Sequence, residues 1–394
     1  MTDLGPDSFE SSPSLPREQR LRAWAEVDLG AISHNIARLK EAAAGAQLMA
    51  VVKADAYGHG LEPVAKTARI AGASWLGVAL LTEALQLRRG GDTGRILSWL
   101  PTPGDAFDEC VRADIDLGVG ASWMLTEIAY AAASVGRTAR VHLKIDTGLG
   151  RSGLTVADWG DLLKQAARLE RAGSIEVVGV WSHFAYADSP DHPTIADQLQ
   201  VFEDAIELAR AAGIDPQLRH IANSAATLSL PEAHFDLVRP GIAVYGISPG
   251  EEVGTSQTLG LRPAMKLAAR LALVKRLPAG HGVSYAHQYV TDQETTVGLV
   301  PLGYADGLPR RSSGVGPVSV RGARLNVAGR MCMDQFVVDL GDSEVNEGDE
   351  VVIFGAGDKG EPTAQDWALA CETIAYEIVT CIGPRVARTY RGGS

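Results

Sequence analysis

Short apolar runs alternate with amphipathic stretches along the first two thirds of the chain. The amphipathic stretches repeat apolar residues at helical spacing, as residues 194–213 do before they end in a glycine. The apolar runs have the length of buried strands. They lie at residues 48–52, 75–80, 95–100, 115–120, 140–145, 175–183, 217–222 and 235–246. Eight strands, each followed by a helix, predict a (β/α)8 barrel.

An open, doubly wound sheet is the competing α/β fold, because it also alternates strands with helices. It usually has fewer strands, and a dinucleotide-binding member would have a GxGxxG motif after its first strand. No such motif occurs in this sequence. The barrel is therefore the favoured architecture.

The pattern changes after about residue 260. Short β-rich segments separated by Gly, Pro and Asp follow one another, and a single helix is expected at residues 364–382. We therefore predict an α/β fold, with an N-terminal (β/α)8 barrel followed by a mainly β C-terminal domain. The expected boundaries are 1–20 for a polar, disordered tail, 21–258 for the barrel and 259–394 for the C-terminal domain.

Composition narrows the class of partner. The chain has 46% apolar residues, 21% charged residues and a net charge of -12, which argues against nucleic acid because phosphate backbones need a basic surface. The sequence contains no run of about 18 apolar residues, so we expect no membrane span. The first 20 residues lack the apolar core of a signal peptide. The four cysteines are widely spaced and form no zinc-binding pattern, so we expect no metal and a reducing, cytoplasmic location.

Polar residues stand where the predicted strands end, which is where barrels place their active sites. Lys53 directly follows the first apolar run, and apolar neighbours would lower the pKa of its amine and make it a candidate nucleophile. One such residue is more often structural, but the agreement of several strand ends favours a site. The other candidates are Lys144, Arg151, His183, Asn223, Ser224 and Arg239.

The loops after the last two strands suggest a phosphate site. Barrels often bind phosphate with these loops and a helix N-terminus. Ser224 suits a helix N-cap and has a hydroxyl to donate, while Gly241, followed by Ile242, lets a backbone N–H approach closely. Ordinary helix capping explains the same residues equally well. A Schiff-base lysine beside a phosphate site fits both a sugar-phosphate aldolase and a pyridoxal phosphate (PLP) enzyme.

Longer motifs resemble the alanine racemase family. AVVKADAYGHG, which holds Lys53, resembles the family's lysine motif letter for letter. The later motifs follow in the family's order: HLKIDTGLGRSG, SHFAYAD, HIANSAATL, VRPGIAVYG, GVSYAHQY, LGYADG, GRMCMDQ and IAYEIVTCIGPRVARTY. The resemblance covers residues 24 to 391 approximately, and it implies a homodimeric, PLP-dependent racemase that interconverts L- and D-alanine and supplies D-alanine for peptidoglycan.

The resemblance implies a role for each candidate. Lys53 would hold PLP and act as the base for D-alanine, while Tyr285, which comes from the partner subunit and lies near His183, would act on L-alanine. Arg239 would donate to the pyridine nitrogen; because arginine only donates, that nitrogen would stay unprotonated, which favours quick reprotonation at Cα over side reactions. The implied cofactor and phosphate ligands are Tyr57, Asn223, Ser224, Gly241, Ile242 and Tyr376.

The substrate side is implied in the same way. Arg151 would meet the phenolic oxygen of PLP and the substrate carboxylate, which the partner subunit's Met333 would also contact through its backbone N–H. Lys144 matches a position that is often carbamylated in the family, and a carbamate there would fix Arg151. A narrow entrance, which suits a small substrate, would be lined by Tyr304, Arg310, Arg330 and Asp334.

Two positions depart from the family's pattern. Ala286 stands where glycine is common, a change expected to affect the turn that places Tyr285, and Tyr186 stands where a small residue is usual. Three alternatives stay open. Lys144 and the entrance residues argue against a broad-specificity amino-acid or serine racemase. Tyr285 and Met333 argue against a PLP-binding protein without turnover, and Arg239 in place of an acid argues against a fold-related decarboxylase.

Overall fold

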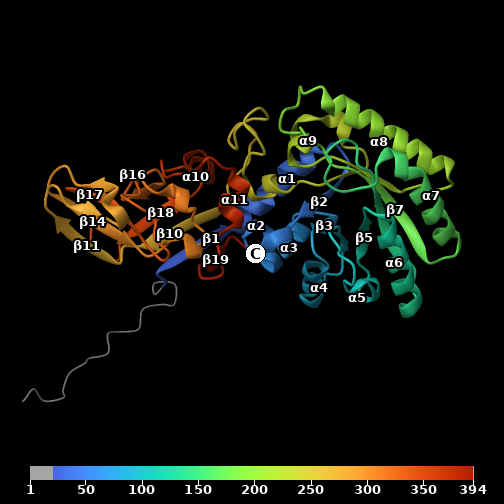
Figure 1. The fold of residues 1–394 in the computed structure, drawn as a ribbon, viewed down its shortest axis with the longest axis horizontal. Coiled ribbons are helices and arrows are strands. Elements are labelled where there is room, and N and C mark those ends of the chain that lie inside the picture. The colour runs from blue at the N-terminus through green and yellow to red at the C-terminus, as the bar shows by residue number, and fades with distance from the viewer. Residues whose placement is uncertain (1–20, 394) are drawn as a thin grey trace, which may run out of the picture.

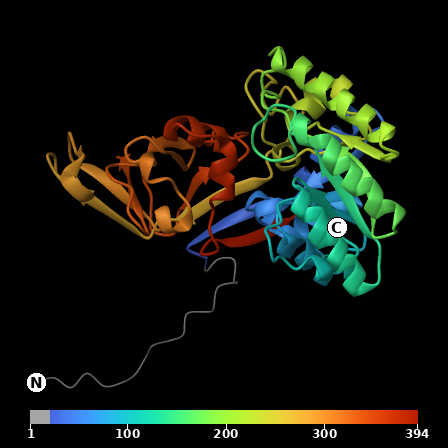
Figure 2. The same cartoon turned by 45° about the vertical axis from the view of Figure 1, so that its right-hand side comes forward.

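The computed structural model describes residues 21–393 and confirms the predicted two-part architecture. Figures 1 and 2 show a barrel surrounded by helices and, beside it, a lobe built mainly from strands, which carries the orange and red part of the chain. The predicted disordered tail falls in residues 1–20, which lie outside the described residues.

Eight parallel strands form the barrel, one from each apolar run. Their order is β8-β7-β6-β5-β4-β3-β2-β9. Backbone hydrogen bonds from Asp236 to Arg219 (3.1 Å) and from Arg239 to Ala222 (2.9 Å) close the barrel between its last two strands. The strands are β2 (Gln47–Val51), β3 (Trp75–Val78), β4 (Arg95–Ser98), β5 (Asp116–Val119), β6 (Ala139–Lys144), β7 (Ile175–Trp181), β8 (Leu218–His220) and β9 (Leu237–Val238).

Helices cover the outside of the barrel, and α7 (Val156–Arg171) shows why they form. Thr155 caps its N-terminus by accepting from the Asp158 N–H, and its buried residues Trp159, Leu162 and Ala166 recur at helical spacing. The others are α1 (Leu29–Ala42), α3 (Leu61–Ile70), α4 (Leu81–Arg89), α5 (Phe107–Arg112), α6 (Ser122–Val135), α8 (Thr194–Ala211) and α9 (Ser224–Ser229). The short element α2 (Lys53–Tyr57) is a turn that follows β2.

A small apolar cluster fills the inside of the barrel toward the N-terminal ends of its strands. It is distinct from the main core and is made of Met49, Trp75, Leu97, Val178, Leu218 and Leu237. The opposite ends of the strands are left to polar side chains, which is the usual place of an active site in this fold.

The C-terminal domain is built from a mainly antiparallel six-stranded sheet, an antiparallel three-stranded sheet and a hairpin. A six-stranded sheet has the order β16-β15-β18-β10-β1-β19, a three-stranded sheet has the order β11-β14-β17, and β12 pairs with β13. The strands are β10 (Met265–Arg270), β11 (Leu273–Leu277), β12 (Gly282–Val283), β13 (Tyr289–Val290), β14 (Thr295–Val300), β15 (Pro317–Val320), β16 (Ala323–Asn326), β17 (Phe336–Gly341), β18 (Glu350–Phe354) and β19 (Ala387–Arg391).

The first described strand does not belong to the barrel. β1 (Ala23–Asp28) pairs antiparallel with β10 and parallel with β19. The sequence assigned residues 21–258 to the barrel, and the start of this range needs correction. The described part of the chain first joins the C-terminal sheet through β1 and then enters the barrel through α1. The partners of β1 lie more than 230 residues away in sequence, and its alternating pattern does not show which sheet it joins.

The prediction of a single helix at residues 364–382 is wrong. Two helices occupy this segment, α10 (Ala364–Cys371) and α11 (Ala375–Thr380). The break falls at Glu372, which has a left-handed backbone (φ 54°), and Ile374 is extended. No glycine or proline marks this break, so the helical spacing of apolar residues continues across it. The break turns α11 toward α2, which bears on the site.

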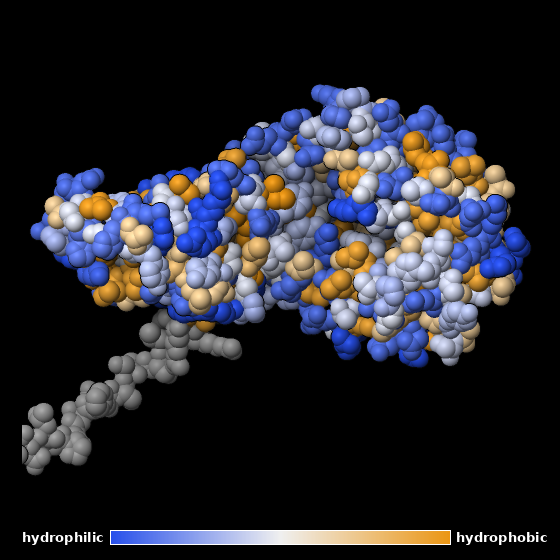
Figure 3. All heavy atoms as spheres, in the orientation of Figure 1, coloured by the Kyte–Doolittle hydropathy of each residue, from blue (hydrophilic) through white to orange (hydrophobic). Residues whose placement is uncertain are grey.

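The face of the molecule drawn in Figure 3 has no broad apolar patch. Figure 3 shows polar and apolar side chains interspersed on both lobes in the view drawn. Among residues 21–393, no helix combines the length and the apolar character that crossing a membrane requires.

Candidate active site

The lysine of the first motif opens an unusual turn. Lys53 follows β2, and the next four residues, Ala54 to Tyr57, all have left-handed backbones with φ between 52° and 54°. Each such L-residue costs roughly 1–2 kcal/mol relative to a right-handed helix. A run of four non-glycine residues in this conformation persists only where the surroundings impose it. Nothing in the sequence predicted the turn, because glycine is absent until position 58.

Two carboxylates hold this turn. Glu83, on α4, accepts from the backbone N–H of Ala54 with Oε1 (2.6 Å), and with Oε2 from those of Ala79 and Leu80 (3.0 and 2.9 Å). Asp55 accepts from the Leu61 N–H at 2.7 Å. Glu83 thus ties the end of β3 to the residue after Lys53. Sequence reasoning missed it, because a glutamate in the first turn of a helix looks like an ordinary capping residue.

The mouth of the barrel is rich in cations. Burial and the charge of Arg151 lower the pKa of Lys53, although Glu83 opposes the shift. Burial, followed by the charges of Arg239 and Arg151, lowers the pKa of Lys144 to about 8. The Lys144 Nζ donates to the Ser152 hydroxyl. These cations influence one another, and together they suit an anionic ligand.

The predicted phosphate-binding residues come together beside the lysine turn. Ser224 Oγ accepts from the backbone N–H of Gly241 (2.8 Å) and of Ala243 (3.3 Å), which joins the start of α9 to the 3-10 helix η3 (Ile242–Tyr245). The Tyr57 ring lies 6.3 Å from the ring of Tyr376, which α11 supplies.

One detail of the sequence interpretation is wrong. Ser224 was assigned as a helix N-cap, but Asn223 caps α9 by accepting from the Ala226 N–H at 3.1 Å. Ser224 is the first helical residue. Its hydroxyl oxygen already accepts two backbone hydrogen bonds, so the hydroxyl proton is left to donate.

Gly241 fits closely against Tyr57. A Cβ added at Gly241 would lie 2.3 Å from the Tyr57 hydroxyl oxygen, a distance that atoms do not tolerate. The glycine therefore lets the phenol and the Gly241 N–H share one small space. Tyr57 Oη, the Ser224 hydroxyl and the Ile242 N–H form a set of donors suited to phosphate oxygens.

Arg239 is buried in the wall of the barrel. Its NH2 donates to the carbonyl oxygens of Ser182 (2.8 Å) and Ile221 (3.2 Å), and its NH1 donates to His220 at 3.0 Å. His183 Nδ1 lies 3.4 Å from NH2, and burial with the nearby charge of Arg239 lowers the pKa of His183 well below its ordinary value. His183 is therefore neutral at pH 7.

The remaining predicted residues lie on the C-terminal domain and are not joined to the barrel site. Tyr285, Met333 and Tyr304 are 69%, 53% and 40% exposed. Hydrogen bonds from Tyr304 N to Cys332 O (3.1 Å) and from Ser284 Oγ to Arg330 O (2.8 Å) hold their loops together. Within residues 21–393, no hydrogen bond connects Tyr285 or Met333 to a barrel residue.

The other entrance candidates lie nearby in the C-terminal domain. Arg310 begins the 3-10 helix η6 (Arg310–Ser312), and its carbonyl accepts from Ser313 Oγ at 2.7 Å. Asp334 pairs with Arg385 at 2.7 Å. The four predicted entrance residues and Tyr285 thus belong to one group of loops in this domain.

The two departures from the family's pattern differ in consequence. Ala286 has a left-handed backbone (φ 59°), so the turn beside Tyr285 requires the conformation that glycine favours. Tyr186 stacks on His192, with ring centroids 3.8 Å apart and planes 3° apart. Ala286 is therefore strained, whereas Tyr186 has a packing partner of its own.

Comparison with known proteins agrees with this geometry. The chain matches the family models for the alanine racemase N-terminal domain over residues 27–249 and C-terminal domain over residues 264–390. The alanine racemase of Frankia casuarinae is 56% identical over 381 residues, which cover 97% of this chain and 99% of that protein. The alanine racemase of Streptomyces coelicolor is 58% identical over 375 residues, covering 94% and 96%.

Solved structures give the same result. The crystal structure of alanine racemase from D-cycloserine producing Streptomyces lavendulae has a TM-score of 0.94 and 57% identity, and it covers 95% of this chain and 98% of that one. Both family models, the near full-length relatives and the fold converge, so the resemblance found in the motifs is confirmed. The chain belongs to the alanine racemase family of isomerases.

Proposed function

We propose that this chain interconverts L- and D-alanine with PLP bound covalently through Lys53. The observation that carries the proposal is the meeting, at one barrel mouth, of an amine of lowered pKa, a buried arginine and a set of phosphate donors. PLP, when bound, withdraws electrons from the substrate Cα and so acidifies its proton. The close fit of Tyr57 against Gly241 supports the cofactor assignment, because it holds the Tyr57 hydroxyl beside the Ser224 hydroxyl, to which the Gly241 N–H is bound.

In this proposal the residues of the site have separate roles in binding the cofactor, binding the substrate and transferring the proton. Tyr57, Asn223, Ser224, Gly241, Ile242 and Tyr376 would hold the cofactor and its phosphate. Arg239 would donate to the ring nitrogen, and Arg151 would bind the substrate carboxylate. The Lys53 amine would hold and return the Cα proton on one face of the substrate, and a tyrosine would do so on the other face.

The second base argues for a homodimer with shared sites. Tyr285, Met333 and Tyr304 are exposed together on the C-terminal domain, whereas Lys53 lies in the barrel. Leu80 and Leu100 are also exposed, 46% and 54%, in the loops after β3 and β4. We infer that a second copy places its Tyr285 and Met333 against this mouth. A cytoplasmic location and a supply of D-alanine for peptidoglycan complete the proposal.

The test is the circular dichroism of L-alanine mixed with PLP-loaded protein. The signal should decay to zero while the total alanine stays constant. Lys53→Ala should abolish the decay and the covalent cofactor absorbance; more than trace activity in that variant would contradict the assignment. Serine and lysine tested in parallel decide whether specificity is broad, and a flat trace with PLP visibly bound would favour a carrier without turnover.

Tyr285→Phe tests the second base separately. Only the phenol oxygen is removed, and Tyr285 is 69% exposed in a single chain, so the fold should be unaffected. The variant should still bind PLP but lose exchange of the Cα proton of L-alanine with solvent deuterium, by about 10²–10⁴-fold. Normal exchange of both enantiomers would refute the two-base mechanism.

A further inference from the structure

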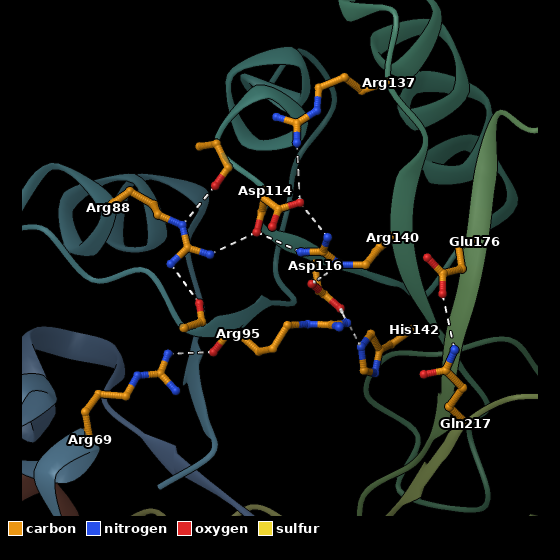
Figure 4. A network of polar contacts seen from close by, with 12 residues as sticks. Arg69, Arg88, Arg95, Asp114, Asp116, Arg137, Arg140, His142, Glu176 and Gln217 are labelled. Carbon is orange, nitrogen blue, oxygen red and sulfur yellow. Dashed lines mark hydrogen bonds and ion pairs between the residues drawn. The ribbon is translucent and has the colours of Figure 1, made fainter.

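A chain of four buried polar side chains runs from the lower part of the barrel wall to Arg239. Asp116 lies at the start of β5, His142 on β6 and His220 at the end of β8, and none of the four is more than 5% exposed. Asp116 Oδ2 lies 3.2 Å from His142 Nε2, His142 Nδ1 lies 2.9 Å from His220 Nε2, and His220 Nδ1 lies 3.0 Å from Arg239 NH1. Figure 4 shows the Asp116 end of this buried polar chain.

The direction of every hydrogen bond in the chain follows from its two ends. Arginine can only donate, so His220 Nδ1 must accept and the proton of the neutral ring must sit on Nε2. His220 Nε2 then donates to His142 Nδ1, and His142 Nε2 donates to Asp116. Burial lowers the pKa of both histidines, which agrees with neutral rings. Each imidazole is thereby held in a single tautomer.

The packing around the two rings is specific. Gly179 on β7 pairs with His142, and a Cβ at Gly179 would lie 2.5 Å from His142 Nδ1. The Trp181 ring is stacked on the His220 ring at 5.7 Å with planes 10° apart, and the Trp75 ring meets the His142 ring edge-on at 5.5 Å. The rings therefore cannot turn freely to other partners.

Asp116 is kept as an anion by a shell of donors. Its Oδ1 accepts from Arg140 Nε (2.8 Å), and its Oδ2 accepts from Arg95 NH2 (2.5 Å) as well as from His142. Burial alone would raise the pKa of Asp116, but the hydrogen bond from His142 and the charges of Arg140 and Arg95 hold it below its ordinary value. Figure 4 shows these donors around the carboxylate, with Asp114 beside Arg140.

We propose that Asp116 is a positioning residue, which fixes the hydrogen-bond direction of His142 and His220 and thereby orients Arg239 toward the active site. The inference rests on the proposed function in one respect, that Arg239 contacts the cofactor ring. A purely structural ion cluster would need Arg95 and Arg140 but not the two histidines. The unbroken line of contacts to Arg239 favours the positioning role.

The first test observes the tautomers without cofactor. Side-chain ¹⁵N spectra of histidine-labelled, cofactor-free protein should show protonated Nε2 and unprotonated Nδ1 at both His142 and His220. Asp116→Asn should change the protonation pattern of both rings. An amide has only one oxygen, so its NH2 must face one of the three groups that donate to Asp116, which are Arg95, Arg140 and His142. Asp114→Asn is the matched control, since Asp114 also pairs with Arg140 but touches neither histidine.

The second test measures turnover of the PLP-loaded enzyme. Asp116→Asn and His142→Leu should each lower kcat for alanine about tenfold or more, as loss of an orienting partner does elsewhere, with KM within about twofold. Asp114→Asn should leave both constants unchanged. His142→Leu keeps Asp116 paired with Arg95 and Arg140, so it tests the link to Arg239 even if Asp116→Asn does not fold.

The outcomes separate this inference from the proposed function. The inference would be overturned if Asp116→Asn left the tautomers of His142 and His220 unchanged, or if neither Asp116→Asn nor His142→Leu lowered kcat. An equal loss of kcat in Asp114→Asn would also overturn it. A wild-type protein that does not racemise alanine would refute the proposed function instead. The tautomer spectra would still decide whether Asp116 sets the direction of the chain.

Discussion

Gly241→Ala is the substitution whose effect the structure defines most closely. The added Cβ would lie 2.3 Å from Tyr57 Oη and 3.0 Å from Tyr57 Cζ. Normal contact requires the hydroxyl to move by about 1 Å. Tyr57 cannot easily move, because it is 8% exposed, its ring lies 4.8 Å from that of Tyr245, and its backbone belongs to the left-handed turn.

The expected magnitude follows from the overlap. Overpacking of this kind costs about 1–3 kcal/mol. If the strain falls on the arrangement that binds phosphate, the Kd for PLP should rise roughly 5- to 150-fold.

The assay is a titration of cofactor-free protein with PLP, followed by absorbance. Gly160→Ala is the matched control, because a Cβ at Gly160 on α7 meets nothing within 4 Å. It should leave Kd unchanged and stabilise the helix by about 1 kcal/mol. Combining Gly241→Ala with Tyr57→Phe removes the clashing oxygen, so the double variant should bind PLP more tightly than the two single effects predict.

Two results would refute this reasoning. Gly241→Ala could bind PLP as tightly as the wild type, which would mean that Tyr57 moves without consequence. The double variant could show simple addition of the two single losses, which would mean that Cβ and hydroxyl do not compete for one space. Either result would remove Tyr57 and Gly241 from the proposed phosphate site as a unit.

Three further predictions concern the rest of the site. Ala286→Gly should stabilise the protein toward urea by about 0.5–1 kcal/mol, because Ala286 has φ 59°, whereas Ala157→Gly on the exposed face of α7 should destabilise it by a similar amount. Glu83→Gln leaves one oxygen for three backbone N–H groups, so hydrogen exchange at residues 54–57 and 79–80 should accelerate about tenfold; unchanged exchange would mean that Glu83 does not hold the turn. We also propose that Lys144 carries a carbamate. Its pKa of about 8, lowered from 10.5, makes the neutral amine available, so a carbamate signal from ¹³C-bicarbonate should grow as the pH rises through about 8 and be missing from Lys144→Met. Without the carbamate, burying the ammonium destabilises the fold below about pH 8, and stability should increase between pH 8 and 10.5.

Strand positions could be predicted because a barrel strand is buried on both faces. Each of the eight apolar runs became a strand, and their C-terminal ends carry the candidates in the barrel, from Lys53 to Arg239. The left-handed turn after Lys53 could not be predicted, because Ala, Asp and Tyr are ordinary residues there and contacts with Glu83 across 29 positions help to impose the conformation. The contact of β1 with the C-terminal sheet was missed for the same reason, distance in sequence.

The buried polar chain was missed although the sequence contained a signal for it. Side chains two positions apart point to the same face of a strand. Lys144 was assigned to the barrel mouth, so His142 must point into the same interior, one layer below it. The same two-residue spacing places Trp181 one layer below His183. In that lower layer, His142 is hydrogen-bonded to His220 and Trp181 is stacked on it, while His183 lies beside Arg239 in the layer above. A polar residue two positions before a mouth residue, inside an apolar strand, is therefore a candidate for the layer that supports the site. The direction of the hydrogen bonds cannot be predicted from the sequence. It is set only when the fold brings Asp116 on β5, His142 on β6 and His220 on β8 into contact with one another and with Arg239, which follows β9.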